Sequence, residues 1–253
     1  MNTVDANCMI GHWPFRKISS TAFENLKEVH SKNGISYGYV SSLSSIFYND
    51  PFEGDEELHE IIGNTNYRHV LTVNPMLPAF ENDIAKGLKN FKISGVRVYP
   101  GYHNYSLDCP EMKALCSVLR KLGLPLFLTL RAEDERLNYL ITPRPVNIPE
   151  IQAFIEDHPD LTVLLLNIRF HEIIAIKDAI LHSGHAFVDT SGLKDQLFNI
   201  EKLTASIGDS RIIYGSLHPL YCLESTLLQV AMANIGQKAK DRILFENSKF
   251  LHI

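Results

Sequence analysis

Short apolar runs alternate with amphipathic segments along the whole chain. The runs LPLFLTL (124–130) and LTVLLLNI (161–168) are almost continuously hydrophobic. Strands that are buried on both faces of a parallel sheet have this composition. Eight segments are predicted as strands on this basis: Thr3–Ile10, Ile35–Ser41, His69–Asn74, Ser94–Pro100, Leu126–Arg131, Thr162–Ile168, Ala186–Thr190 and Arg211–Ser216.

Amphipathic segments fill the intervals between these strands. In one of them Phe80, Ile84 and Leu88 share one helical face. The weakest interval is Asp55–Gly63, whose apolar spacing predicts only a short helix. Strict alternation of strands with helical connections implies a parallel sheet with right-handed crossovers. Since the chain has no GxGxxG or Walker-type loop, we expect an α/β fold in which residues 1–253 form a single (β/α)8 TIM barrel, one domain.

Length and charge narrow the class of protein further. The chain has 253 residues, with 24 Lys and Arg against 29 Asp and Glu, and a single barrel has about 250 residues. This slight acidity disfavours a nucleic acid or an anionic membrane as partner, and no apolar run reaches the roughly 20 residues that span a bilayer. Four cysteines without CxxC spacing and an N-terminus unlike a signal peptide predict a cytoplasmic protein. Assembly into a homo-oligomer is left open.

In a TIM barrel the active site forms where the strands end at their C-terminal side. Arg97, Arg131 and Arg169 follow three consecutive strands at that end. We interpret them as a cationic mouth that grips a carboxylate or a phosphate through paired hydrogen bonds. The alternative is that they form ion pairs with nearby carboxylates and stiffen the rim; the candidate partners are Glu133, Asp134 and Asp189.

Other polar and aromatic side chains follow the same strand ends. His103 and His218 are candidate proton carriers, and Asp189 is a candidate general base. Tyr99 and Trp13 are candidate walls of the pocket. Cys8 has the opposite parity to its neighbours and is predicted to point outward, toward the helices. The histidines after strand ends lack HxH and HExxH spacing, so polar rim residues are favoured over a metal cluster: His12, His103, His171 and His218.

Several segments together resemble the amidohydrolase-related family of metal-dependent TIM-barrel hydrolases. VDANCMIGHWPF is similar to the family's first strand, GVRVYPGYHNYSLDCPE to its fourth strand and loop, and RIIYGSLHPL to its last strand. ILFENSKFL is similar to its closing helix. The family includes lactonases acting on pyrone dicarboxylates and sugar lactones, and decarboxylases of aromatic and muconate-type acids. The resemblance therefore implies a small carboxylated or sugar-derived substrate.

The positions that hold metal or activate water in that family are altered in this chain. By the resemblance, two first-strand histidines correspond to Asn7 and Met9, and the last-strand aspartate corresponds to Leu217. The histidines of two middle strands correspond to Thr129 and Asn167. A divalent site of this kind needs imidazole and carboxylate ligands. A divalent metal such as zinc is expected of the family, but we predict that this mouth holds no metal and no other cofactor.

Three functions are compatible with these observations. The favoured one is a metal-independent, lactonase-like hydrolase for a small anionic metabolite, with His218, His103 or Asp189 moving protons. An alternative is a catalytically inactive barrel that binds a metabolite or a protein. The third is that another ligand set still binds zinc or manganese. The substrate-binding residues predicted for the mouth are Arg97, Tyr99, Arg131, Arg169, Asn7, Asn167, Thr129 and Trp13.

Overall fold

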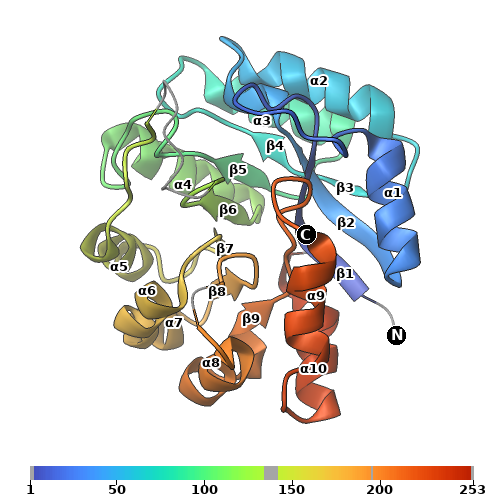
Figure 1. Cartoon of the computed structure of the whole chain (residues 1–253). Helices are drawn as coiled ribbons and strands as arrows, with labels where there is room; N and C mark the ends of the chain where they lie inside the picture. Colours follow the sequence, from blue (N-terminus) through green and yellow to red (C-terminus); the bar gives the residue numbers. More distant parts are fainter. Residues whose placement is uncertain (1–2, 134–141, 195, 252–253) are drawn as a thin grey trace.

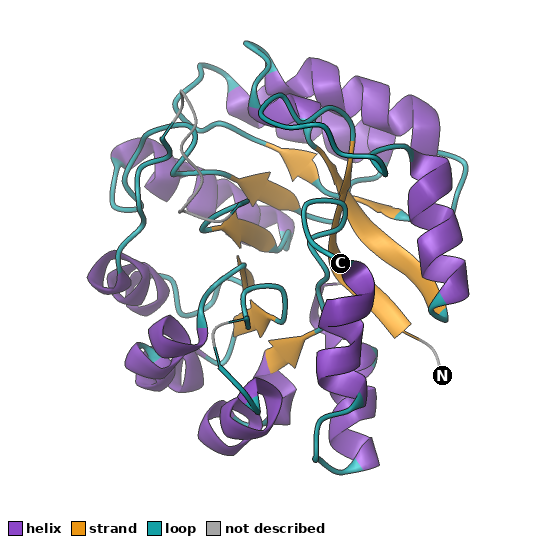
Figure 2. Cartoon of the chain, in the orientation of Figure 1, coloured by secondary structure: helices purple, strands orange, loops and turns teal. Residues whose placement is uncertain are grey.

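Parallel strands form the centre of the molecule, and helices surround them (Figures 1 and 2). The structure, a computed structural model, describes residues 3–133, 142–194 and 196–251. The described strands are β1 Thr3–Ile10, β2 Ile35–Ser42, β3 Arg68–His69, β4 Leu71–Thr72, β5 Val96–Val98, β6 Leu126–Thr129, β7 Val163–Leu166, β8 Ala186–Asp189 and β9 Ile212–Ile213.

Hydrogen bonds join the strands into a barrel. Pairing runs β1-β2-β3 and then from β4 through β9, all parallel. Val70 joins the two sheets, because its N–H donates to the Val40 carbonyl at 2.9 Å while that of Leu71 donates to Gly95 at 3.0 Å. β3 and β4 are thus halves of one barrel strand. At the other seam the Leu217 N–H donates to the Asn7 carbonyl at 2.7 Å, beyond β9. The predicted TIM-barrel architecture is confirmed.

The helices follow the strands in chain order, with short 3₁₀ turns at Ser44–Ile46, Asp209–Arg211 and Glu246–Leu251 and a π-helical turn at Gly87–Phe91. None of the helices in the described residues is long and apolar enough to span a membrane. The helices are α1 Phe23–Lys32, α2 Pro51–Ile62, α3 Phe80–Lys86, α4 Pro110–Leu122, α5 Ile148–Asp157, α6 Phe170–Ala175, α7 Lys177–Ser183, α8 Asn199–Ile207, α9 Leu223–Ala231 and α10 Gln237–Leu244.

The prediction of a short helix in the second connection is wrong. α2 has 12 residues and begins earlier than expected. Asp50 caps it by accepting a hydrogen bond from the Phe52 N–H at 3.0 Å, and Pro51 occupies the first helical position. Both are ordinary start signals of a helix. The apolar count missed them because this helix also buries a glycine and an aspartate, Gly54 and Asp55.

A bulge in β1 decides which of its side chains face the barrel axis. The pairing of β1 with β2 shifts between Asp5 and Cys8, where β1 has one extra residue. Beyond the bulge Met9 packs with other residues of the mouth, whereas Cys8 packs with α1 and α2 residues. The outward orientation predicted for Cys8 is confirmed. Deeper in the barrel the axis is filled by apolar side chains, including Val4, Ala6, Tyr39, Val70, Phe127, Leu164, Leu166, Phe187 and Ile213.

Candidate functional site at the barrel mouth

A layer of polar side chains lies above this apolar filling, toward the C-terminal ends of the strands. Side chains alternate along a strand, so the residue two positions beyond Tyr39, Val70, Phe127 or Phe187 also faces the axis. Each of these residues is polar, and each is at most 3% exposed. We call the set the polar layer; its members are Asn7, Ser41, Thr72, Arg97, Thr129 and Asp189.

Arg97 on β5 is the cation of the polar layer, and it is 1% exposed. Its Nε donates to Thr129 Oγ1 at 2.8 Å, and its guanidinium carbon lies 5.2 Å from the centre of the Tyr99 ring. Its Nη2 has no hydrogen-bond partner among the residues that the structure describes. Among the described residues no carboxylate lies within ion-pair distance of Arg97. A buried arginine is normally paired, so the Nη2 of this side chain is available to an anion.

Four more buried polar atoms around the axis lack a hydrogen-bond partner in the described parts of the chain. They are the hydroxyl oxygens of Ser41, Thr72 and Tyr99 and the Oδ1 of Asn7. Buried polar groups in folded proteins are almost always hydrogen-bonded, so each exception calls for a bound polar group. The three hydroxyls can donate to a ligand, and Asn7 Oδ1 can accept from one. With Arg97 they suit a small ligand that is anionic and hydroxylated.

Asp189 on β8 is the buried carboxylate of the polar layer. Its Oδ2 accepts from Asn7 Nδ2 at 2.7 Å, and its Oδ1 accepts from the Asn167 N–H at 2.8 Å. Burial raises the pKa of Asp189 to about 6, against hydrogen bonds from Ser191 and Asn7 that lower it. A carboxyl group that titrates near neutrality can both accept and donate a proton. The structure therefore keeps Asp189 as a candidate acid or base.

The other two arginines lie at the rim rather than in the polar layer. Arg131 forms a two-pronged ion pair with Glu172, at 2.8 Å and 2.7 Å, and donates to the Asn167 carbonyl at 2.9 Å. Glu172 also accepts from the Arg169 N–H at 2.8 Å, at the start of α6. Arg131 therefore forms an ion pair at the rim, as the alternative interpretation expected, but its partner is Glu172 and none of the three carboxylates named from the sequence. Asp134 lies outside the described residues.

The two candidate histidines are separated from the polar layer. His103 Nε2 is bonded to the Ile46 carbonyl at 3.0 Å, and burial lowers its pKa. His218 pairs with Cys8 across the β1 seam, so its side chain shares the outward face. The expected place of His218 in the mouth is a misassignment: Leu217 takes the inward position. His12 and His171 are exposed.

An apolar cluster covers the polar layer. Met9 and Leu217 pack there with Trp13 and Tyr99, all at most 2% exposed. Trp13 contacts two further aromatic rings edge to face, at 5.3 Å and 5.4 Å between ring centres. Its own ring N–H is buried without a partner. We call the aromatic residues of this cluster that come from loops the aromatic cover. They are Trp13, Phe15, Phe47 and Tyr102.

Sequence reasoning missed Ser41, Thr72 and Glu172. Ser41 and Thr72 lie inside predicted strands, and the period of two from Tyr39 and Val70 assigns both to the axis. That signal was present in the sequence. No comparable signal exists for Glu172, because it meets Arg131 from a different connection, 41 positions away along the chain.

The fold is shared with solved structures of low sequence identity. An uncharacterised TIM-barrel protein from Bordetella bronchiseptica matches with a TM-score of 0.76 at 14% identity, covering 99% of this chain and 98% of that one. A dihydroxybenzoic acid decarboxylase from Polaromonas sp. JS666, solved with manganese and 2-nitroresorcinol, matches with a TM-score of 0.76 at 13% identity, covering 99% and 97%.

A protein described as amidohydrolase 2, from Bifidobacterium longum subsp. infantis, matches with a TM-score of 0.65 at 14% identity, covering 98% and 97%. No family model matches the chain, and no curated protein matches it. The resemblance to amidohydrolase-related barrels is thus confirmed as a shared fold.

Proposed function

We propose that this chain is a divergent amidohydrolase-related barrel that binds a small carboxylated metabolite in its polar layer. The observation that carries the proposal is Arg97, a buried guanidinium whose Nη2 has no hydrogen-bond partner and which has no carboxylate within ion-pair distance among the described residues. Asp189, the buried carboxylate of the same layer, acts on Arg97 only at longer range. A buried charge without a close partner is costly, and a carboxylate ligand compensates it with charge-assisted hydrogen bonds. The neighbour from Polaromonas sp. JS666 is named as a dihydroxybenzoic acid decarboxylase, and this name supports a carboxylated ligand here.

The mouth does not fit the divalent metal of the related barrels. Met9 and Leu217 are packed in the apolar cluster. Thr129 Oγ1 accepts from Arg97, and Asn7 Nδ2 donates to Asp189. Amide and hydroxyl groups are weak ligands for zinc or manganese. The chemistry proposed for this mouth therefore uses the side chains of the polar layer and no metal at these positions.

The mechanism we infer is hydrolysis of a lactone, without a metal. The ligand's carboxylate binds Arg97, which positions the ring. Asp189 in its ionised form takes a proton from water as the water oxygen adds to the ring carbonyl, and hydroxyl donors such as Tyr99 and Ser41 stabilise the resulting oxyanion. The ring C–O bond then breaks, and the proton passes from Asp189 to the leaving oxygen. The product is an open-chain hydroxy acid.

The experiment is a screen of EDTA-treated protein against carboxylated lactones, sugar lactones and hydroxybenzoates. Binding is read from thermal shift, and turnover from proton NMR. We expect at least one carboxylated ligand to bind and to lose binding in Arg97→Gln, while the matched control Arg120→Gln at a surface ion pair keeps it. If no carboxylated compound binds, or if Arg97→Gln binds as the wild type does, the proposed function is wrong.

A non-catalytic binding barrel is the second candidate, and the apolar cluster over the polar layer favours it. Met9 and Leu217 fill positions where the related barrels carry chemistry, and both are fully buried. In this case the same screen gives Arg97-dependent binding without turnover of any ligand, and Asp189→Asn changes nothing that NMR detects. Turnover that disappears in Asp189→Asn selects the hydrolase instead.

A further inference from the structure

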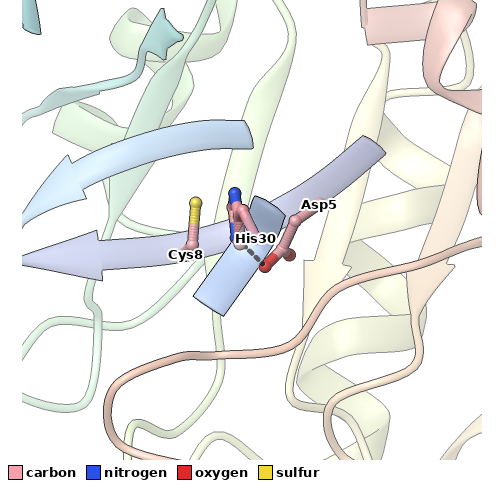
Figure 3. A group of neighbouring side chains, drawn as sticks. All are labelled: Asp5, Cys8 and His30. Atoms are coloured by element: carbon pink, nitrogen blue, oxygen red, sulfur yellow. Dashed lines mark hydrogen bonds and ion pairs between the residues drawn. The ribbon is translucent and has the colours of Figure 1, made fainter. Parts of the chain in front are cut away.

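Metal-ligating side chains meet on the outward face of β1, beneath α1 and away from the mouth. Asp5 and Cys8 come from β1, and His30 comes from α1 (Figure 3). Each of the three is at most 1% exposed. One ligand atom from each lies within 4.8 Å of the others, and His30 Nε2 is 3.3 Å from Asp5 Oδ2. Carboxylate, thiolate and imidazole are all ligands of zinc.

His218 brings a second imidazole to this group. It pairs with Cys8 across the seam of the barrel, and the Met9 N–H donates to its carbonyl at 2.8 Å. Its side chain is 7% exposed, and its Nε2 is buried without a partner. The bridge to Cys8 sets His218 beside the group, although its ring nitrogens are not among the donors that lie within 4.8 Å of one another. The outward face therefore gathers four donors of the types that closed tetrahedral zinc sites use.

Neighbouring groups hold the donors in place. Asp5 Oδ1 accepts from the N–H groups of Asn7 and Ser216, at 3.0 Å and 2.9 Å. His30 Nδ1 lies 3.0 Å from the Tyr67 hydroxyl, which can accept the Nδ1 proton and leave Nε2 free for a metal. Gly38 faces the group from β2: a Cβ there would lie 2.5 Å from Cys8 Sγ. Such supporting contacts are what orient the ligands of a metal site.

Three of the donors require only a small contraction around an ion. Zinc bonds of about 2.0 to 2.3 Å place tetrahedral ligand atoms about 3.5 Å apart, so the donors of Asp5, Cys8 and His30, which lie within 4.8 Å of one another, approach by about an ångström. The His218 imidazole lies outside that spread and has to turn toward the ion. Without an ion, the Cys8 thiol donates to the Tyr39 carbonyl at 3.3 Å. With one, the thiol loses its proton, and the thiolate and the Asp5 carboxylate neutralise the dication.

We propose that Asp5, Cys8, His30 and His218 form a closed structural zinc site in the wall of the barrel. It ties β1 to α1 and to the chain beyond β9, the seam where the barrel closes. Its donors face away from Arg97, so it supplies no chemistry to the mouth. The metal site does not depend on the proposed function. Metal bound at this site would neither support nor contradict ligand binding at Arg97, and a variant that loses the metal is not expected to lose the ligand.

The test uses the intact protein, purified after expression with added zinc and, separately, with added cobalt. We expect about one equivalent of metal by elemental analysis. The cobalt form should show the intense near-ultraviolet absorption of a thiolate–cobalt bond together with the visible bands of a tetrahedral ion. Cys8→Ser should abolish the thiolate band, whereas the matched control Cys116→Ser, another fully buried cysteine, should keep it.

Two further measurements keep the outcome decisive if Cys8→Ser folds poorly. The wild-type cobalt spectrum needs no variant. Wild-type protein that holds less than a tenth of an equivalent of metal after zinc-supplemented expression overturns the proposal. His218→Gln, at the least enclosed ligand, should weaken zinc retention against a chelator at least tenfold. Retention equal to that of the wild type overturns the role of His218, and a thiolate band surviving in Cys8→Ser overturns the site itself.

Discussion

The polar groups on the two sides of β1 differ in character. On the inward side, the polar layer presents the Arg97 Nη2 and the hydroxyls of Ser41 and Thr72, which have no hydrogen-bond partner among the described residues. On the outward face, Asp5 and His30 are bonded to each other and to their surroundings, and the donors are a carboxylate, a thiol and imidazoles. The inward face thus suits an anion and the outward face a cation. Alternation along one bulged strand is enough to separate the two.

The two sets of buried polar groups should also respond differently to substitution. Asp5 and His30 are hydrogen-bonded within the fold, so replacing either should lower stability. The polar layer keeps polar atoms without a partner, so replacing its cation Arg97 should weaken ligand binding instead. Each of the following changes acts on one side of this contrast.

The largest effect is expected from Asp5→Asn on the outward face. The Asp5 carboxylate accepts hydrogen bonds from two backbone N–H groups, from the Ser216 hydroxyl and from His30. Removing one partner of a buried, bonded ionic group typically costs about 4 kcal/mol. Urea unfolding measures the loss. The control Asp83→Asn, at a partly exposed pair with Lys86, should change stability by less than about 0.5 kcal/mol. Equal losses in both variants would contradict the contrast.

A pH-dependent effect is expected from Asp189 on the inward face. Burial raises its pKa from 3.8 to about 6, so the folded state binds this proton more tightly than the unfolded state does. The contribution of Asp189 to stability is therefore greatest below pH 4 and falls as pH rises toward 6. The fall amounts to about 3 kcal/mol. It is measured as the difference between wild type and Asp189→Asn in urea unfolding at pH 4 and pH 7; parallel profiles exclude it.

Arg97→Met should separate ligand binding from stability. Loss of a buried charge-assisted contact weakens carboxylate binding at least about 100-fold, or about 2.7 kcal/mol. Because no described carboxylate pairs with Arg97, the unliganded variant should be as stable as the wild type or more stable. Calorimetric titration and urea unfolding give the two numbers. A strongly destabilised Arg97→Met would mean that the fold itself satisfies this cation.

Sequence patterns predicted the barrel because apolar strand segments alternate with amphipathic helical segments. This alternation can be recognised in a single sequence without an alignment. They also predicted that Cys8 faces outward, since parity is a local property. His218 was misassigned because Leu217, the residue before it, faces the mouth at the seam beyond β9, so His218 faces outward. The partner of Arg131 was missed because Glu172 comes from another connection. Ion pairs between different connections, such as this one, depend on how the loops pack at the rim. The local spacing of residues in the sequence does not predict that packing.

The smallest effect is expected from Arg131→Gln. This variant tests whether the rim arginine contributes to ligand binding, as Arg97 does, or only to stability, as Asp5 does. Arg131 and Glu172 are 12% and 9% exposed and share two hydrogen bonds. Losing such a nearly buried pair should lower the free energy of unfolding by about 1 to 2 kcal/mol. Because Arg131 is already neutralised, carboxylate affinity should stay within about twofold of wild type. Affinity that falls as far as in Arg97→Met would return Arg131 to the binding site and extend the anion-binding surface from the polar layer to the rim.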